Sequence, residues 1–436
     1  MRRRGVALWS NWAGDQRCAP ERVADAADEA AVIAAVRGAV ATGRPLRVAG
    51  SGHSFTDIAC TDGHMLRLGR MNRVLGADAA SGIAEVEGGA TIRELGPLLA
   101  EHGLALENQG DVDPQTIAGA IATATHGTGA RYRNISAQVA GLRLVTAAGE
   151  VVECSADEDP ELFRAARVGL GALGVVTGVR LRCAPLYTLR RTDAPQPLDA
   201  TLERLDELVD GSERFELFVF PYTRTALTRT TERTDDPPRP PSAAHAWLTD
   251  VGLENGVLGL VMRIGRAAPF AIPTLNRLLT RLVQPSRRVD RSYRIYANPR
   301  LVHFTEMEYA LPRAAGREAL ERVMAMIERR RLPISFPIEF RFVAPDDAYL
   351  SPATGRETAY IAVHTYRGME HETYFRAVEA IMREYDGRPH WGKRHYRTAA
   401  DLRPAYPDWD RFQSVRERMD PKRLFRNDHL DRVLGR

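Results

Sequence analysis

Residues 45–57 read Pro45-Leu-Arg-Val-Ala-Gly-Ser-Gly-His-Ser-Phe-Thr-Asp57, and this segment says most about how the chain folds. Its first five residues are typical of a short buried strand, which Gly50, Ser51 and Gly52 follow directly. Small residues after a strand form a loop whose backbone N–H groups can turn toward an anion such as a pyrophosphate. No helical pattern follows, so the loop itself has to hold the anion. On its own, His53 in such a turn is more often structural than functional.

Strand and helix patterns alternate on both sides of this loop, up to about residue 185. A helix is predicted for residues 28–42, with its apolar side chains on one side and Gly43 at its end. Further strands are predicted at 83–86, 142–146, 151–154 and 175–183, with helices at 92–102 and 159–167. This alternation indicates one α/β unit.

The pattern changes after residue 185. Residues 188–200 are polar, and they are followed by predicted helices at 202–208 and 317–330 and strands at 215–222, 304–309, 335–343 and 359–366. The last stretch, from 388, reads as short turns and helices. We therefore expect an α+β chain divided into residues 1–185, a sheet-and-helix domain at 186–387, and a C-terminal segment at 388–436.

The composition limits the classes of function. The 436 residues carry a net charge of only +4, with no basic tract interleaved with aromatic residues, which argues against nucleic-acid binding. The four cysteines lie far apart and form no C-x-x-C pair, so neither a metal site nor a disulfide framework is expected. Nearly every basic residue is arginine; Lys393 and Lys422 are the only lysines, which hints that a compact ammonium is needed there.

No membrane or secretion signal is evident in the sequence. The N-terminus has no apolar run long enough for a signal peptide. The apolar stretch 251–283 is interrupted by Arg263, Arg266, Arg277 and Arg281, which favours packed helices over a membrane span. We expect a cytoplasmic protein, with a peripheral membrane contact at this stretch as the less favoured alternative.

Gly169-Leu-Gly-Ala-Leu-Gly174 matches the dinucleotide fingerprint G-x-G-x-x-G. That motif binds a pyrophosphate only where it follows a strand and opens a helix. Here a predicted helix precedes the glycines and a strand follows them. A tight helix-to-strand turn is therefore favoured over a nicotinamide site.

A second segment rich in small residues runs from Asn108 to Gly129 and ends in Ala122-Thr-Ala-Thr-His-Gly-Thr-Gly129. So many small residues suit neither an ordinary helix nor an ordinary strand. They fit backbone that passes close to a flat ligand, and they fit a tightly packed turn at a sheet corner equally well.

Taken together, these segments resemble the vanillyl-alcohol-oxidase flavoprotein superfamily, and within it the aldonolactone oxidoreductases and alditol oxidases. The resemblance extends to Gly171-Ala-Leu-Gly-Val-Val176, Pro337-Ile-Glu-Phe-Arg341 and His390-Trp-Gly-Lys-Arg-His395, so it covers most of the chain. Among these groups, the bacterial gulonolactone oxidases and dehydrogenases are the most similar.

The resemblance implies an FAD-binding domain in two pieces, with the middle domain covering the substrate side. In relatives with this loop a histidine carries FAD through its 8α-methyl carbon, and His53 holds that position. No cysteine lies between Gly110 and Gly119 to make a second bond. The remaining flavin contacts implied are Gly50, Ser51, Gly52, Ser54, Gly110, Asp111, Gly119, Thr123, His126, Gly127, Gly129 and Val175.

The resemblance also implies the residues of the reaction. Glu339 and Arg341 are two apart on a predicted strand, so both side chains leave one face. From the spacing alone an ordinary ion pair is the favoured interpretation; the family pattern turns this face toward the flavin. Arg341 would then hold substrate oxygens, Glu339 would bind hydroxyls, and Lys393 would lie over flavin and substrate. Asp111, His364 and His395 are implied substrate contacts.

The activity that the resemblance implies is oxidation of a sugar-derived alcohol, most closely an aldono-1,4-lactone of the gulono-, galactono- or arabinono-type. Alditol oxidases carry a serine at the position of Asp111, which favours lactones over linear polyols. Gly110 aligns with a position that gates oxygen, where a small residue favours oxidase activity. The acceptor is expected to be oxygen or a cytochrome- or quinone-type carrier. Alternatives are an alditol or sugar-alcohol oxidase, a cyclitol or glycoside tailoring oxidase, and a non-catalytic flavin-binding electron-transfer subunit.

Overall fold

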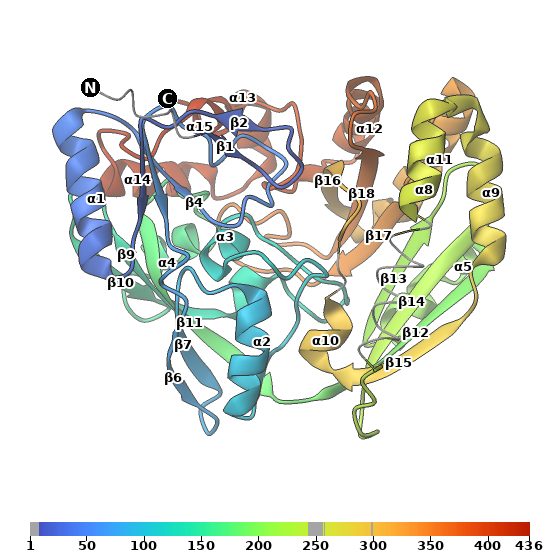
Figure 1. Cartoon of the computed structure of the whole chain (residues 1–436), viewed down its shortest axis with the longest axis horizontal. Coiled ribbons are helices and arrows are strands. Elements are labelled where there is room, and N and C mark those ends of the chain that lie inside the picture. The colour runs from blue at the N-terminus through green and yellow to red at the C-terminus, as the bar shows by residue number, and fades with distance from the viewer. Residues whose placement is uncertain (1–7, 243–255, 257, 298–299) are drawn as a thin grey trace.

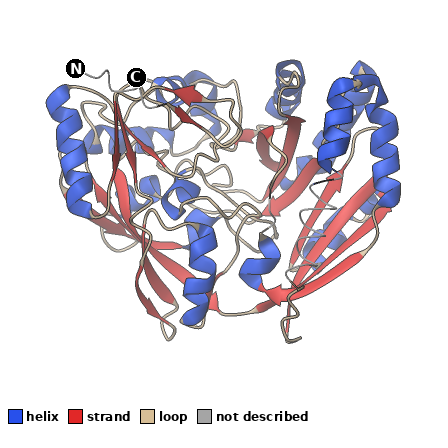
Figure 2. Ribbon diagram, in the orientation of Figure 1, coloured by secondary structure: helices blue, strands red, loops and turns tan. Residues whose placement is uncertain are grey.

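The structure is a computed structural model that describes residues 8–242, 256, 258–297 and 300–436. Figure 1 shows two lobes side by side, with the N- and C-terminal ends together on one lobe and a large sheet in the other. The lobe with the termini holds the early strands, helices α1 to α4 and the last helices of the chain. Figure 2 shows that helices cover the outer face of the large sheet.

The lobe that contains the termini is built on two main sheets. A parallel three-stranded sheet has the order β3-β5-β4, with bounds Arg22–Asp25, His64–Arg67 and Leu46–Ala49. An antiparallel sheet has the order β10-β9-β11-β7-β6, with bounds Val151–Ser155, Val139–Val145, Val175–Pro185, Ile83–Glu87 and Val74–Asp78; β8 (Leu104–Leu106) also pairs with β11. The helices here are α1 (Glu29–Thr42), α2 (Ile92–Glu101), α3 (Ile117–Ala122) and α4 (Pro160–Ala166), and β1 (Trp9–Ser10) pairs with β2 (Arg17–Cys18).

The end of the chain returns to this lobe. Helices α13 (Ala399–Leu402), α14 (Trp409–Met419) and α15 (Asp428–Leu434) share one hydrophobic core with β7, β9, β11 and α2. Asn427 caps the N-terminus of α15 and donates to the carbonyl oxygens of Asp57, Ile58 and Cys60. The tail thus fixes the loop that follows His53, because three carbonyl groups of that loop depend on one side chain.

The second lobe is an eight-stranded antiparallel sheet with the order β15-β12-β14-β13-β17-β18-β16-β19. Its strands span Ser286–Arg291, Thr188–Pro197, Thr225–Thr234, Arg214–Val219, Ile338–Val343, Thr358–Tyr366, Phe304–Pro312 and Arg388–Pro389. One face packs an apolar core against α5 (Leu198–Glu203), α6 (Leu205–Gly211), α11 (Gly316–Arg330) and α12 (Glu372–Glu384). Because side chains alternate between faces along a strand, the residues between the apolar ones point toward the other lobe.

Several sequence expectations can be compared directly with these elements. Residues 169–174 form a turn between α4 and β11, with positive φ at Leu170, Gly171 and Gly174, which confirms the helix-to-strand interpretation. Strand β12 was not predicted, since residues 188–200 read only as polar. The division of the chain at residues 185 and 388 stays a prediction. The first two residues of the expected C-terminal segment form β19, which belongs to the eight-stranded sheet.

The apolar stretch 251–283 is described only in part. Residues 251–255 and 257 lie outside the described residues, while α8 (Leu258–Ala267) and α9 (Ile272–Leu282) form two separate helices. Among the described residues, no helix is long and apolar enough to cross a membrane.

Candidate active site

Two cavities lie side by side, and His53, Ser54, Gln115 and Thr123 line both of them. The first lies within the lobe that contains the termini, and the second lies between the two lobes. The first cavity runs along the loop after β4, helix α3 and the turn at residues 169–174. The second is lined by the charged face of the eight-stranded sheet. A ligand that fills the first cavity therefore presents one end to the second.

The loop after β4 offers the first cavity a row of backbone donors. Within the described chain, the N–H groups of Ser51, Gly52, His53 and Ser54 donate to no other group of the protein. Gly52 has φ +72°, the left-handed conformation that lets successive amides point to one side. Successive free amides of this kind form a nest that binds anions.

His53 lies where the two cavities meet, with its ring stacked 5.4 Å from that of Trp12, centroid to centroid. Burial, helped by the positive charges of Lys393 and Arg93, lowers the pKa of His53 to about 4. The imidazole is therefore neutral at physiological pH, which is the nucleophilic form.

The other residues implied as flavin contacts fall into three groups. Gly50, Ser51, Gly52, Ser54, Gly119 and Thr123 line the first cavity, as expected of residues along one ligand. Gly110, Asp111 and His126 line the second cavity instead. Gly127, Gly129 and Val175 line neither: Gly129 donates to the carbonyl of Phe342, a Cβ on Gly127 would lie 2.4 Å from the carbonyl oxygen of Gln109, and Val175 is fully buried in a hydrophobic cluster.

The second cavity takes its charges from alternate positions of three neighbouring strands. On β17, Glu339 and Arg341 face the cavity while Ile338, Phe340 and Phe342 pack into the core behind the sheet. The same alternation places Glu306 and Glu308 of β16, and His364 of β18, on the cavity side. The period of two in these strands thus separates the site from the core.

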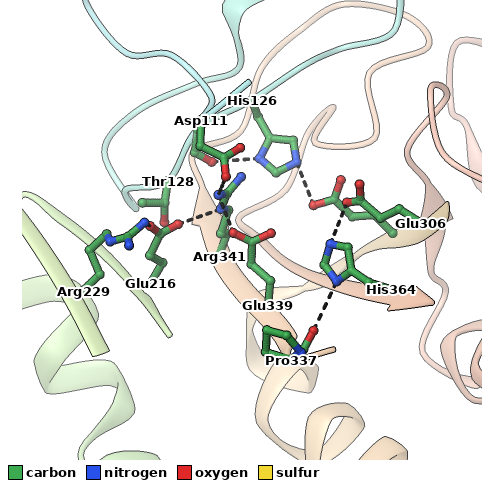
Figure 3. Close-up of polar contacts among 12 residues, drawn as sticks. Asp111, His126, Thr128, Glu216, Arg229, Glu306, Pro337, Glu339, Arg341 and His364 are labelled. Carbon is green, nitrogen blue, oxygen red and sulfur yellow. Dashed lines mark hydrogen bonds and ion pairs between the residues drawn. The ribbon is translucent and has the colours of Figure 1, made fainter. Parts of the chain in front are cut away.

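Arg341 is the centre of the charged face (Figure 3). Its Nε donates to Glu216 at 2.7 Å, and one terminal nitrogen lies 3.3 Å from Asp111 and forms an ion pair with Glu339. Asp111 is also paired with Arg300. Burial opposes the charge of Asp111, but Arg300, Arg341 and Lys393 together hold the pKa of Asp111 below its usual range, so it is ionised.

Glu339 behaves in the opposite way to Asp111. Burial raises the pKa of Glu339 to about 7, with Arg341 lowering it and the like charges of Asp111 and Glu216 raising it further. A carboxyl group with such a pKa can accept or release a proton near neutral pH. Glu339 and Asp111 therefore differ in protonation although both contact Arg341.

Lys393 enters the cavity from the turn that follows β19. Its Nζ lies 2.5 Å from Glu306 and 5.2 Å from the centre of the Phe55 ring. Burial lowers the pKa of Lys393, but Glu306 and Glu308 outweigh that effect and raise it overall, so the ammonium stays charged. His364 lies 3.5 Å from the other oxygen of Glu306 and 3.2 Å from the carbonyl oxygen of Pro337.

His126, Glu308 and His390 place their ligand atoms within 4.8 Å of one another, and so do Glu306, Glu339 and His364. Internal contacts account for the first group without an ion. His126 Nδ1 lies 2.8 Å from the carbonyl oxygen of Gly127 and its Nε2 lies 3.2 Å from Glu308, while the N–H of Gly392 donates to Nδ1 of His390. Burial lowers the pKa of His390 to about 3, so its ring is neutral. In the second group, Glu306 and Glu339 are paired with Lys393 and Arg341.

His395 is not brought to either cavity. It is buried with its ring between Trp391 and His429, and neither ring nitrogen has a hydrogen-bond partner among the described residues. Conversely, the second cavity is lined by Arg300, Glu306 and Glu308, which the sequence analysis did not single out. Glu306 and Glu308 carried a signal, since they are two apart on a predicted strand as Glu339 and Arg341 are.

Comparison with known proteins identifies the family to which the chain belongs. Residues 179–433 match the D-arabinono-1,4-lactone oxidase family and residues 20–155 match an FAD binding domain. The chain belongs to the D-arabinono-1,4-lactone oxidase family. It is 56% identical to L-gulono-1,4-lactone dehydrogenase of Mycobacterium tuberculosis, over 98% of this chain and 99% of that protein. It is 34% identical to L-gulonolactone oxidase of Bos taurus, over 98% of each. The resemblance to aldonolactone oxidoreductases of the vanillyl-alcohol-oxidase type is thereby confirmed.

Solved structures of other proteins have the same fold as this chain. Cholesterol oxidase of Brevibacterium sterolicum superposes with a TM-score of 0.83 at 18% identity, over 98% of this chain and 97% of that one. The expected α+β fold, an FAD-binding part with a second sheet-and-helix part, is confirmed.

The residues of the first cavity fit FAD. Its free amides at residues 51–54 suit the pyrophosphate, and its wall of small residues along α3 and the turn at 169–174 leaves room for a long flat ligand. The G-x-G-x-x-G turn thus borders the flavin cavity without acting as a Rossmann motif.

Proposed function

We propose that the protein is an FAD-dependent oxidoreductase that oxidises an aldono-1,4-lactone of the gulono-, galactono- or arabinono-type at the alcohol carbon next to the lactone carbonyl. The observation that carries this proposal is the junction of the two cavities at His53, where a flavin site opens onto buried Arg341, Lys393 and Glu339. Bound FAD supplies the acceptor for the hydride that leaves the alcohol carbon.

Each charged side chain has a role in this proposal. Arg341 and Lys393 donate hydrogen bonds to substrate oxygens and stabilise the negative charge that develops as the hydroxyl loses its proton. Glu339 binds the hydroxyl and receives its proton, for which a pKa of about 7 is suited. Asp111 and His364 contact the remaining polar groups of the sugar. Asp111 is held ionised by Arg300, so it can only accept hydrogen bonds.

His53 is proposed to carry the flavin covalently through the 8α-methyl carbon. Its place at the meeting point of both cavities and its neutral imidazole support this assignment. The test is denaturing electrophoresis of the yellow protein: flavin fluorescence should remain with the wild-type band and be absent from the His53→Ala band. Release of all flavin from the wild-type protein by acid precipitation would overturn the covalent bond and leave FAD binding intact.

The electron acceptor is proposed to be oxygen or a cytochrome- or quinone-type carrier, and the location cytoplasmic. The relatives carry both kinds of name, a dehydrogenase in Mycobacterium tuberculosis and an oxidase in Bos taurus. Gly110, which aligns with the position that gates oxygen in relatives, lines the second cavity. A Cβ on Gly110 would lie 2.9 Å from the carbonyl oxygen of His126, so only glycine fits there without movement.

An anaerobic panel tests the substrate class. Gulono-, galactono- and arabinono-1,4-lactone are mixed with the holoenzyme and the loss of flavin absorbance is followed, with linear polyols as the comparison. Bleaching by lactones but not by polyols is expected. Bleaching by polyols alone would favour an alditol oxidase, and no bleaching by any compound would favour a non-catalytic flavoprotein. Readmission of air or of an artificial dye then identifies the acceptor.

A further inference from the structure

A row of alternating charges crosses four neighbouring strands of the large sheet and ends at Arg341. In the antiparallel register, Asp193 of β12 lies opposite Arg229 of β14, Arg229 opposite Glu216 of β13, and Glu216 opposite Arg341 of β17. We call these four residues the charge ladder. Residues directly opposite each other on one face are close enough for their side chains to interact.

The side chains of the charge ladder are joined end to end. Arg229 lies 2.5 Å from Asp193 through its Nε and 3.0 Å from Glu216 through a terminal nitrogen, while the other oxygen of Glu216 accepts from Arg341 Nε at 2.7 Å. The Glu216 and Arg341 side chains are only 7% and 8% exposed. Burying so many charges in sequence is a poor way to gain stability, because desolvation offsets the attraction between them. Their arrangement therefore calls for another explanation.

The geometry at Arg341 supplies that explanation. Glu216 holds the Nε edge of the guanidinium, and Arg229 holds Glu216 in turn, so the plane of Arg341 is fixed from behind. One terminal nitrogen of the same guanidinium meets Asp111 and Glu339 in the cavity. A planar fork fixed on one edge presents its remaining donors in one direction only.

We propose that Glu216 and Arg229 are positioning residues of the oxidation, which act through Arg341 by fixing the edge of its guanidinium that meets the substrate. This inference rests on the proposed lactone oxidation, since Arg341 is assigned its substrate contact there. Neither residue lines the cavity, so neither touches the substrate itself.

The charge ladder also acts on Glu339. That carboxyl group faces Arg341 on its own strand, Glu216 on β13, His364 on β18, Glu306 on β16, and Asp111 and Arg300 on the loops that close the cavity. Burial is the largest influence on the pKa of Glu339, and the negative charge of Glu216 raises this pKa further. Removing the charge of Glu216 should lower the pKa of Glu339, and removing the positive charge of Arg229 should raise it.

The experiment compares holoenzymes carrying Glu216→Gln, Arg229→Gln and Asp193→Asn with the wild type. Flavin reduction by the lactone is followed under anaerobic conditions across pH 5–9. In Glu216→Gln we expect a loss of reduction rate of about tenfold or more, together with a shift of the acid limb to lower pH. In Arg229→Gln the limb should move to higher pH. Asp193→Asn, at the far end, should repeat the direction of Glu216→Gln with a smaller amplitude.

Asp236→Asn is the matched control, because it removes a carboxylate that pairs with Arg190 and Arg287 at the edge of the same strands, outside the charge ladder. Its rate and pH profile should equal those of the wild type. Shifts of the same sign in Glu216→Gln and Arg229→Gln, or unchanged profiles in both, would overturn the proposal. If Glu216→Gln fails to fold, Arg229→Gln and Asp193→Asn carry the same opposite-sign test.

A wrong assignment of the substrate would give a different result from a wrong assignment of the positioning residues. If no lactone reduces the wild-type flavin, the substrate assignment is wrong, and the charge ladder is then tested without turnover. The visible absorbance of the bound flavin is titrated with pH in the same variants, since a carboxylate that ionises beside the flavin perturbs its spectrum. Opposite displacements of that titration in Glu216→Gln and Arg229→Gln are expected, and their absence would overturn the inference.

Discussion

We call the first cavity the flavin cavity and the second the substrate cavity, after the ligands proposed for them. They share four lining residues but are made from different parts of the chain. The flavin cavity is built largely from backbone and small side chains, with free amides at residues 51–54 among its polar groups. The substrate cavity is built from large charged side chains that come from separate strands and pair with one another. The first thus offers shape and amides to a ligand, whereas the second depends on a balance among its paired charges.

The largest effect should follow from removing a charge of the substrate cavity. Lys393→Met keeps the apolar stem of the side chain and deletes the ammonium near Glu306. We expect kcat/KM for the lactone to fall by about 10²–10³-fold, because a buried donor to the developing negative charge is lost. Flavin content per protein should stay at the wild-type level.

Lys422→Met is the matched control, since Lys422 is the only other lysine and is exposed on the surface. It should leave kcat/KM and flavin content unchanged. Loss of flavin in Lys393→Met with normal turnover of the remaining holoenzyme would contradict the division of labour between the two cavities.

The pH dependence of the substrate cavity gives the next effect. Only the carboxylate form of Glu339 can receive the hydroxyl proton, and its pKa is raised to about 7. We therefore expect kcat/KM to rise with pH through about 7 and to level off above it. Glu339→Gln should lower the plateau by about 10²-fold and remove this limb, whereas an unaltered limb in the variant would assign the titration to another group.

The sequence predicted residues of both cavities, and for a physical reason in each case. Gly50, Gly52 and Gly119 line the flavin cavity, and the pattern of small residues is itself the signal because small residues let the backbone come close to a ligand. The period of two likewise placed Glu339 and Arg341 on one face. Neither property depends on contacts with distant parts of the chain.

The partners of those side chains could not be predicted in the same way. Arg300 meets Asp111 from 189 residues away, and nothing in its local sequence indicates that pairing. Strand β12 was read as polar chain because Asp193 and its neighbours look like exposed residues, although Asp193 pairs with Arg191 of its own strand and with Arg229 of the next. His395 lies two residues after Lys393, yet its ring packs against Trp391 and His429 and lines neither cavity.

The smallest effect should come from the flavin cavity. Gly52→Ala places a Cβ at a residue with φ +72° and 3.3 Å from the Trp9 ring. A left-handed conformation costs an L-residue about 1–2 kcal/mol, and relief of that strain would turn the neighbouring amides away from the pyrophosphate. In a His53→Ala background, where bound FAD can exchange, we expect FAD affinity to weaken by about five- to thirtyfold, measured by flavin fluorescence titration.

Gly43→Ala is the matched control, because Gly43 has φ +64°, no atom of the described residues lies within 4 Å of the added Cβ, and Gly43 ends α1 away from both cavities. It should lower the free energy of unfolding by a comparable amount and leave FAD affinity unchanged. Equal FAD affinity in both glycine variants would mean that the loop conformation at Gly52 does not set the flavin site.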